Sequence, residues 1–574
     1  MSAKRARGAV CVLLCVCARL VGGETRASEL AGGRSPGGGG GGGERAVPVT
    51  ASPAGEFRGS WMRSRRGRDF HAYRGIKYAE PPVGPRRFQP PVPIVKYPAP
   101  VEAGADGPAC PQPAAPGTSI DEDCLTLNVY TPANHGLKDL PVVVYIHAGG
   151  FYSMSGRSLI AGPHYLLDRD LVLVTFNYRI GSLGFLALGT ADAPGNVGFK
   201  DQVAALRWVQ RNIAAFGGDP GLVTISGCSA GSLSAMLHMI SPMSRGLFHR
   251  AISMSGSPTS KVASPASRMD LAVKQARFSG CPTSPPEAIY RCLQTKTWQE
   301  LAGSLLGFFE FGFDPLSLFR PVVEPDFGQE RFLPLEPMDA IREGKMHSVP
   351  YIISQTRDEF FWKAFTVLNN ETLLRTMDEE WERVAPISFI LPRDNSSEPS
   401  RRLRQAYFGD RRLHNDSWTA ERLGKLYGDA ITGFPVHRLA NLMCRHSGRP
   451  VWYYELDYSG EHSWYEDSIT NKPAGVAHHD DLLYLFTLSF RFPTIEVSDS
   501  DDSKMVDKMT AMWYNFARYG DPTPTSGAES FGLRWPAMTP DARRFLKLGR
   551  ELSVHEDMFL ERFRVWDELY PIQY

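Results

Sequence analysis

One serine of the chain has surroundings that suit nucleophilic catalysis. Residues 227–231 read GCSAG, and they follow an apolar run at residues 223–226 (VTIS) and open a helical stretch at residues 231–240. On a sharp turn from strand to helix, a nucleophile is held at strained backbone angles, and glycines two positions away remove side chains that would collide. The same pattern occurs at residues 33–37 in a glycine-rich run, so the context identifies Ser229 as the candidate.

A serine nucleophile also needs hydrogen-bond donors for the oxyanion that its attack creates. Residues 147–151 (HAGGF) directly follow the apolar run at residues 141–147 (PVVVYIH). We expect the backbone N–H groups of Gly149 and Gly150, with that of Ala230, to form the oxyanion hole. The alternative interpretation of Gly149 and Gly150 is an ordinary turn.

Apolar runs of strand length recur along the chain with helical stretches between them. Runs without polar alternation are typical of strands covered on both faces, so they predict an α/β fold with a mostly parallel sheet. The runs are residues 141–147, 171–178, 223–226, 349–355 and 451–456.

Two helices are predicted by apolar side chains at helical spacing. Residues 201–216 have the pattern of a crossover helix between two of the strands. Residues 505–516 carry a second apolar stripe, which we expect to be part of the core: Met505, Met509, Met512, Trp513 and Phe516.

Several longer motifs give the chain a family resemblance. Residues 122–129 (EDCLTLNV) and the GCSAG turn look like the two signatures of the type B carboxylesterases, the carboxylesterase and cholinesterase family. The likeness runs from about residue 57 to near the C-terminus, and it continues at residues 74–84 (RGIKYAEPPVG), 195–202 (GNVGFKDQ), 216–220 (FGGDP) and 513–517 (WYNFA). It implies an α/β-hydrolase fold, a mostly parallel central sheet flanked by helices, and serine esterase activity.

The resemblance also implies an acid and a base for Ser229. The family acid matches Glu359 in residues 356–359 (TRDE), although the glycine that usually follows is Phe360 here, and Asp358 is the alternative. The family histidine matches His478 in residues 475–481 (GVAHHDD), which fit the pattern GxxHxx(D/E), and its neighbour His479 is the alternative.

With these roles, His478 would take the Ser229 proton, Glu359 would orient the imidazole, and water would release the acid from an acyl-enzyme. This chemistry requires no cofactor, and the sequence contains no cluster with metal-ligand spacing.

Differences from other members of the family narrow the range of substrates that we expect. In cholinesterases, a tryptophan in the loop closed by the first disulfide holds the quaternary ammonium group by cation–π attraction. The corresponding loop here, from Cys110 to Cys124, has no aromatic residue, which argues against acetylcholine. Insect juvenile hormone esterases also resemble the chain, but they usually carry Gln where Cys228 stands. We expect small or lipophilic esters, with a pocket whose candidate walls are Phe151, Phe319, Phe361 and Trp362.

The family also includes catalytically dead adhesion proteins. A weak or inactive adhesion or matrix-binding module is therefore the alternative function, although the chain keeps all three triad candidates.

The amino-acid composition and the N-terminal sequence indicate which partners the protein has and where it is sent. Lys plus Arg (63) balances Asp plus Glu (62), so no overall field would draw the protein to nucleic acid. Residues 1–23 have basic, apolar and small-residue regions in the order of a secretory signal peptide. Residues 24–55, rich in glycine, predict a disordered leader, and residues 56–574 predict one domain without a membrane span. We expect a secreted protein.

Secretion would permit disulfides and glycans. Cys110 with Cys124 and Cys281 with Cys292 would each close a short loop, which would leave Cys228 and Cys444 as free thiols. Acceptor sequences for N-linked glycans occur at Asn370 (NET), Asn395 (NSS) and Asn415 (NDS).

Overall fold

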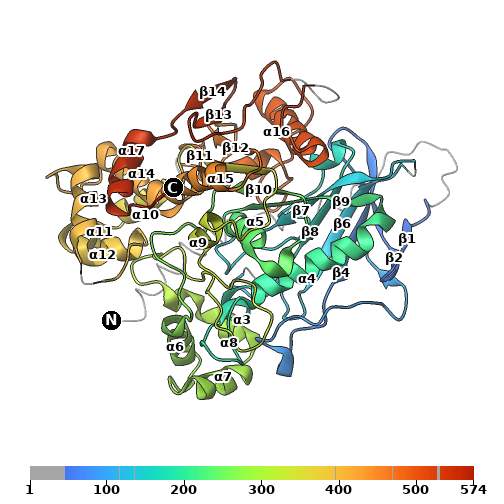
Figure 1. Ribbon diagram of the computed structural model, residues 1–574, viewed down its shortest axis with the longest axis horizontal. Coiled ribbons are helices and arrows are strands. Elements are labelled where there is room, and N and C mark those ends of the chain that lie inside the picture. The colour runs from blue at the N-terminus through green and yellow to red at the C-terminus, as the bar shows by residue number, and fades with distance from the viewer. Residues whose placement is uncertain (1–44, 115–116, 135, 395, 468–469, 526–530) are drawn as a thin grey trace.

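The computed structural model describes residues 45–574 except residues 115–116, 135, 395, 468–469 and 526–530. Within these residues, eleven strands form one sheet (Figure 1). In sheet order they are β14 (Leu552–Glu556), β13 (Arg544–Leu548), β12 (Val451–Leu456), β11 (Tyr351–Thr356), β10 (Arg250–Met254), β9 (Gly218–Cys228), β7 (Leu140–Ile146), β8 (Val172–Phe176), β6 (Thr126–Pro132), β4 (Asp69–Lys77) and β3 (Ser60–Arg63).

The strands from β13 to β8 in this order pair in parallel, and the pairs at both edges of the sheet are antiparallel. The α/β class and the mostly parallel sheet expected from the sequence are therefore confirmed. Each of the five predicted runs overlaps a strand, although β9 begins at Gly218, five residues before the predicted start.

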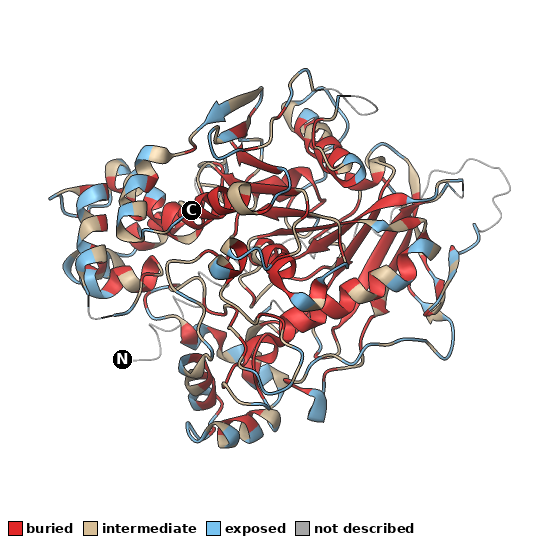
Figure 2. Cartoon of the chain, viewed as in Figure 1, coloured by how far each residue is buried: buried red, intermediate tan, exposed pale blue. Residues whose placement is uncertain are grey.

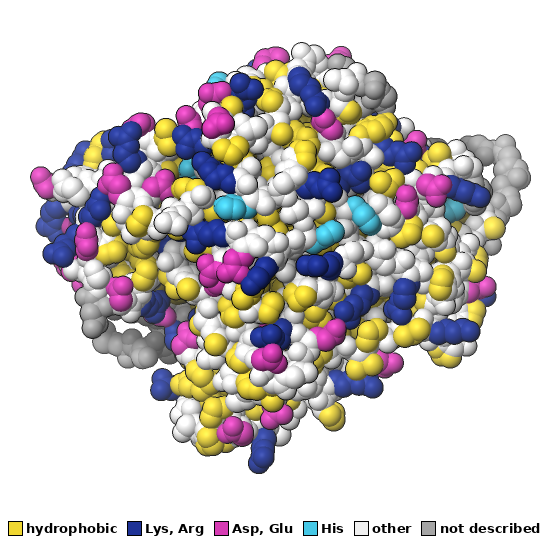
Figure 3. All heavy atoms as spheres, in the orientation of Figure 1, with side chains coloured by type: hydrophobic (Ala, Val, Ile, Leu, Met, Phe, Trp, Pro, Cys, Tyr) yellow, Lys and Arg dark blue, Asp and Glu magenta, His cyan; other side chains and the backbone are white. Residues whose placement is uncertain are grey.

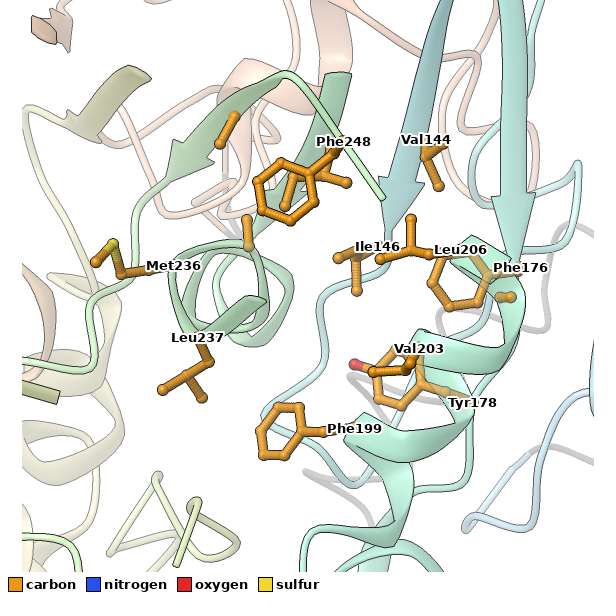
Figure 4. Packing of buried hydrophobic residues seen from close by; sticks show 14 of the residues in the cluster. Val144, Ile146, Phe176, Tyr178, Phe199, Val203, Leu206, Met236, Leu237 and Phe248 are labelled. Atoms are coloured by element: carbon orange, nitrogen blue, oxygen red, sulfur yellow. The ribbon is translucent and has the colours of Figure 1, made fainter. Parts of the chain in front are cut away.

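The central strands are covered on both faces, as their unbroken apolar runs predict. Alternate side chains of β7 belong to different core clusters: Val142, Val144 and Ile146 to one, Val143 and Tyr145 to the other. The first cluster includes side chains of α4 (Val197–Asn212) and α5 (Ala230–Ile240), several of which are drawn with those of β7 in Figure 4. The second cluster includes α16 (Asp501–Tyr519) with the predicted stripe from Met505 to Phe516, which is buried.

Most of the other helices form two groups beside the sheet (Figures 1 and 2). One group has its own apolar core: α10 (Trp362–Leu368), α11 (Glu371–Glu379), α12 (Trp381–Ser388), α13 (Glu398–Phe408), α14 (Ser417–Gly428) and α17 (Leu560–Leu569). A second group shares another: α3 (Gly181–Phe185), α6 (Met269–Phe278), α7 (Pro286–Gln294) and α8 (Trp298–Gly303). The remaining α-helices are α9 (Pro337–Arg342) and α15 (Phe434–His446), and a π-helical turn, η6 (Asp429–Gly433), joins α14 to α15.

The predicted leader is wrong at its C-terminal end. A small sheet of β1 (Val49–Ser52), β2 (Gly55–Arg58) and β5 (Val101–Glu102) includes residues assigned to that leader. Contacts distant in sequence hold this segment, since Thr50 bonds to the Tyr73 hydroxyl at 2.7 Å and Ala54 N–H donates to Asn212 at 3.0 Å. The folded region therefore begins before residue 56. The predicted signal peptide, residues 1–23, lies outside the described residues.

The sequence also predicts two disulfides, three glycosylation sites and no membrane span. Cys110 bonds to Cys124 and Cys281 to Cys292, which confirms both disulfides, and Cys228 and Cys444 are free. Asn370 and Asn415 are exposed, whereas Asn395 lies outside the described residues. In the described ranges, no helix is long and apolar enough to cross a membrane. Basic and acidic side chains are interspersed over the face shown in Figure 3.

Candidate active site

Ser229 occupies the turn between β9 and α5 with φ 56° and ψ −115°, a backbone conformation that non-glycine residues rarely adopt. The glycines on either side are required by close backbone contacts. A Cβ atom on Gly227 would lie 2.3 Å from the carbonyl carbon of Gly231, and one on Gly231 would lie 2.0 Å from the carbonyl oxygen of Ile146. The predicted reason for the GxSxG spacing therefore holds in the structure.

The strand order brings other loops to this turn. Ser229 N–H donates to the carbonyl oxygen of Met254 at 2.8 Å, at the end of β10. Ser255 N–H donates in turn to Ser354 of β11 at 2.9 Å. Because parallel strands end at the same edge of the sheet, the segments that follow β9, β10 and β11 lie next to one another. Glu359 is three residues beyond the end of β11.

The HAGGF loop lies against the same turn, because Gly231 at the start of α5 packs on the end of β7. Gly149 and Gly150 have φ values of 110° and 60°, and a Cβ atom on Gly149 would lie 2.1 Å from the Ser153 carbonyl oxygen. The N–H groups of these two glycines donate to no other described residue. Ala230 is the first residue of α5, so its N–H has no partner within the helix. The N–H groups of Gly149 and Gly150 are thus without a partner among the described residues, and that of Ala230 is not used by its helix.

His147 is the first residue of this loop, and contacts of its ring hold it in place. Its ring stacks on Tyr178 with the centroids 4.2 Å apart, and its Nδ1 lies 2.8 Å from the Ala148 carbonyl oxygen. Burial lowers the pKa of His147 to about 4, so the ring is neutral at physiological pH. The first residue of the loop is therefore held by an uncharged contact between two aromatic rings.

The structure brings Glu359 and His478, which are 119 positions apart in the sequence, together. His478 Nδ1 lies 2.5 Å from Glu359 Oε2, and both side chains are about 3% exposed. The other carboxylate oxygen of Glu359 accepts a hydrogen bond from Thr356 N–H at 3.0 Å. A carboxylate that accepts from Nδ1–H fixes the imidazole tautomer and leaves the lone pair on Nε2.

His478 Nε2 is buried and has no hydrogen-bond partner among the described residues, so no hydrogen bond joins it to Ser229 in this structure. Hydrogen bonds between catalytic groups are commonly long before substrate binds and tighten in the complex. The imidazole is thus oriented by its acid and has a free nitrogen.

The alternative acid, Asp358, has a different environment. Its Oδ2 accepts from the Arg357 guanidinium and from Val476 N–H, both at 2.9 Å, and its own N–H donates to the Val476 carbonyl at 3.1 Å. Asp358 therefore ties the acid loop to the histidine loop instead of contacting an imidazole. This positioning role is not predicted by the sequence, in which the only signal is a second carboxylate beside Glu359.

The alternative base, His479, has no carboxylate partner in the described part of the chain. Its ring packs edge-on against Trp464 at 5.3 Å. Burial, and then the neighbouring His478, lower the pKa of His479 well below the usual value. These contacts give the two adjacent histidines different environments: His478 is hydrogen-bonded to Glu359, whereas His479 packs against the indole of Trp464.

Two further aspartates follow the histidines, and burial raises the pKa of each to about 7. Asp480 braces the loop, since it accepts hydrogen bonds from Ser463 Oγ, from Trp464 N–H and from Ala477 N–H at 2.7–3.0 Å. Asp481 is fully buried, and its Oδ1 has no partner within the described chain. The raised pKa reduces the negative charge that Asp481 places near Glu359 below pH 7.

Phe360 replaces the glycine that usually follows the family acid. It has φ 49°, in the left-handed region where a side chain costs about 1–2 kcal/mol, which explains the preference for glycine. Its ring packs on the His478 imidazole with the centroids 4.0 Å apart. The departure noted in the sequence is therefore a residue in direct contact with the proposed base.

Cys228 is fully buried in the second core cluster, and burial raises the pKa of its thiol well above the usual value. A thiol in this environment behaves as a small apolar side chain.

The four predicted pocket aromatics separate into three groups. Phe151 is buried between Phe185 and Phe199, with the ring centroids 5.0 and 5.3 Å apart. Phe319 lines a small recess of about 20 Å³ next to the HAGGF loop, with Tyr152, Ile180, Leu305 and Phe308. Phe361 and Trp362 contact Tyr465 instead. The recess beside the oxyanion loop is therefore largely apolar. No group of three or more His, Cys, Asp or Glu side chains in the described ranges could hold a metal ion.

Comparison with known proteins identifies similar sequences in one family, the carboxylesterases. The sequence profile of the Carboxylesterase family matches residues 45–566. Juvenile hormone esterase of Tribolium castaneum is 35% identical over 497 residues, which are 83% of this chain and 84% of the relative. Carboxylic ester hydrolase of Bombus ignitus is 33% identical over 513 residues, which are 87% and 89% of the two chains.

Among solved structures, juvenile hormone esterase from Manduca sexta, with OTFP covalently attached, is similar at a TM-score of 0.81. The sequences are 28% identical, and the match covers 92% of this chain and 100% of the other. The family resemblance and the α/β-hydrolase fold predicted from the sequence are thus confirmed.

Proposed function

The chain belongs to the carboxylesterase family and is a carboxylic ester hydrolase, and we propose that it cleaves small, lipophilic esters through an acyl-enzyme on Ser229. The observation that carries the proposal is the 2.5 Å contact of His478 Nδ1 with Glu359, which leaves Nε2 of the same ring without a partner. An imidazole held in this tautomer is a base for the hydroxyl at the end of β9.

Catalysis begins when His478 Nε2 takes the Ser229 proton and Oγ attacks the ester carbonyl. The oxyanion that forms is stabilised by the N–H groups of Gly149, Gly150 and Ala230, and each such donor typically contributes about 3–4 kcal/mol to transition-state stabilisation. Glu359 stabilises the imidazolium without taking its proton.

Breakdown of the tetrahedral intermediate completes the first half of the reaction. The imidazolium gives its proton to the leaving alkoxide, so the alcohol departs and the acyl group stays on Ser229. Water then loses a proton to Nε2 and attacks the acyl carbonyl, and the carboxylic acid leaves as Oγ regains its proton. No group outside this chain is required for the proton balance.

The substrate class follows from the walls near the oxyanion donors. The recess beside the HAGGF loop is lined mainly by aliphatic and aromatic side chains, including Tyr152, Phe308 and Phe319. The recess, of about 20 Å³, is too small for a whole acyl group, so its lining supports only the apolar character of a substrate group that would lie against it.

We also propose that the enzyme is secreted after removal of residues 1–23 and is glycosylated at Asn370, Asn395 and Asn415. The two disulfides support this destination, because such bridges persist in oxidising compartments. Treatment of the secreted protein with an N-glycosidase should reduce its apparent mass. An unchanged mass would contradict glycosylation at these sites.

The test of the catalytic proposal is covalent labelling. Paraoxon should inactivate the protein towards aryl esters, and peptide mapping should place the phosphoryl group on Ser229. Ser229→Ala should lower turnover by about a millionfold while the protein stays folded. A label on another residue, or an active alanine variant, would refute the assignment.

A further inference from the structure

Two glycines of α14 lie directly against the acid loop (residues 357–361), which carries the proposed catalytic acid. A Cβ atom on Gly428 would lie 2.3 Å from the Glu359 carbonyl oxygen and 3.4 Å from Glu359 Cβ. A Cβ atom on Gly424 would lie 3.2 Å from Phe361 Cβ. Both glycines are buried, and because they are four positions apart they share one face of the helix. This face is therefore in contact with the backbone of the acid loop.

The backbone of α14 does not itself require these glycines. Gly428, the last residue of the helix, has φ −58° and ψ −49°, which are ordinary helical values. Gly424 lies within the same helix. At helical angles, glycine is less favourable than any residue except proline, so its use at both positions needs another cause. The close contacts with the acid loop supply that cause.

A buried carboxylate connects α14 to the segment that follows the acid loop. Asp314 Oδ2 accepts a hydrogen bond from the Tyr427 hydroxyl at 2.8 Å, and Asp314 Oδ1 lies 2.6 Å from Lys363 Nζ. Tyr427 directly precedes Gly428, and Lys363 belongs to α10, which follows the acid loop. The side chains of Asp314 and Lys363 are 2% and 1% exposed. The glycine contact thus lies beside a polar connection that is shielded from solvent.

Empty space borders the acid loop at this contact. A cavity of about 430 Å³ is lined by residues of the loop, including Glu359, and by residues of β11, α14 and η6. A segment next to a cavity can move, whereas a close-packed core resists displacement. The end of α14 is packed in such a core through Leu423, Leu426 and Tyr427. A side chain added at Gly428 should therefore displace the loop and not the helix.

We propose that Gly428, together with Gly424, is a positioning residue for ester cleavage, because the bare face of α14 sets the place of Glu359 relative to His478. The inference rests on the proposed role of Glu359 as the catalytic acid. Cβ atoms stay at least 3.0 Å from an oxygen of this kind, so alanine at position 428 must shift the Glu359 carbonyl. The contact of Glu359 with His478 is 2.5 Å long, and a misplacement of about 1 Å in such a constellation costs about a hundredfold in rate.

Steady-state kinetics of Gly428→Ala on an aryl ester tests the proposal. We expect kcat to fall about a hundredfold with little change in KM, because α14 contributes no residue to the recess beside the oxyanion loop. Gly303→Ala is the matched control. Gly303 is also the last residue of a helix, α8, with φ −64°, and a Cβ atom there would meet nothing within 4 Å. Its turnover should equal that of the wild type, and urea unfolding checks that both variants are folded.

A double-mutant cycle with Glu359→Ala separates positioning from a structural role. If Gly428 acts through Glu359, Gly428→Ala should cost less than about threefold once that side chain is gone. A merely structural role would cost the same factor in both backgrounds. Equal factors, or wild-type turnover in Gly428→Ala, would overturn the proposal. Little loss in Glu359→Ala by itself would instead refute the proposed catalytic acid.

Gly424→Ala keeps the proposal testable if Gly428→Ala does not fold. Its Cβ atom would lie 3.2–3.3 Å from atoms of Phe361, which is tight but can be relieved by a small shift of the loop. We expect kcat to fall by about threefold to tenfold, and the loss should disappear when Glu359 is replaced by alanine. In that case an unchanged rate, or the same loss in both backgrounds, would overturn the proposal.

Discussion

The nucleophile turn and the acid–base pair are held by different means. In residues 227–231, a backbone contact between Gly227 and Gly231 acts within five consecutive residues, and Gly231 also lies against the carbonyl oxygen of the distant Ile146. Glu359 and His478 are 119 positions apart and meet because two loops are joined by hydrogen bonds between Asp358 and Val476. The constraint on the nucleophile turn is thus visible in the spacing of its glycines, whereas the acid–base pair depends on hydrogen bonds between two loops that are distant in the sequence.

This difference has a consequence for substitution. Overlap between backbone atoms can be relieved only by moving the chain, whereas a loop held by several polar contacts tolerates the loss of one of them. The hydrogen bond between His478 and Glu359 is the exception, because it is the one hydrogen bond that the imidazole makes to the described residues; Phe360 contributes ring packing only.

Glu359→Gln should have the largest effect in the acid–base region. The amide keeps the size of the side chain but removes the charge that stabilises the imidazolium, so turnover of an aryl ester should fall by about ten-thousandfold. Steady-state kinetics on folded protein measures this loss. If Asp358→Ala costs more than Glu359→Gln, the two carboxylates have the opposite roles.

Gly231→Ala tests the steric region. The new Cβ atom would lie 2.0 Å from the Ile146 carbonyl oxygen, so either α5 or the end of β7 must move. Displacement of one oxyanion donor should lower turnover by about a hundredfold or more, with a loss of about 1–3 kcal/mol of stability. Kinetics and urea unfolding measure the two effects. Gly303→Ala, the same change at the end of α8 where a Cβ atom would meet nothing within 4 Å, is the matched control, and equal losses in both variants would contradict the steric explanation.

Asp481→Asn tests the buried charge of the histidine loop. The folded protein holds the Asp481 proton up to a pKa of about 7, whereas the unfolded chain releases it near the ordinary value of 3.8. The wild type should therefore lose stability as pH rises from about 4 to 7, and the amide should remove that loss, by up to roughly 3 kcal/mol between pH 5 and pH 8. Urea unfolding at both pH values gives the difference. Parallel curves for the two proteins would show that Asp481 ionises normally.

Asp358→Ala should have a smaller effect, because it removes one tie between the loops. We expect roughly a tenfold fall in turnover, since Asp480 still braces the histidine loop. Asp358→Asn keeps an acceptor for Val476 N–H and should recover most of the rate. A loss in the asparagine variant as large as in the alanine variant would point to the charge, through Arg357, and not to the hydrogen bond.

His479→Gln should have the smallest effect. Its ring packs on Trp464 and has no acid partner within the described chain, so turnover should change by less than about tenfold, whereas His478→Gln should abolish it. The same kinetic assay compares the pair. The reverse result would exchange the two histidines.

Several features could be predicted from the sequence because their causes are local. The apolar runs predicted the central strands, the spacing of Met505 to Phe516 predicted a core helix face, and the glycines around Ser229 predicted the turn. Short loops also made both disulfides predictable. In each case a steric or hydrophobic requirement acts within a few residues, so the sequence alone specifies it.

Other features depend on residues that are distant in the sequence. The folded segment at Val49–Ser52 lies next to a glycine-rich run and is held by Tyr73 and Asn212. Asp358 and Asp480 are two aspartates beside catalytic candidates, and only their contacts identify them as braces of the loops. A cavity of about 430 Å³ beside Glu359 is lined by residues of β11, α14, η6 and α17, and no single element encloses it. Hydrogen bonds and enclosed volumes depend on where separate segments meet, and the tertiary structure alone decides that.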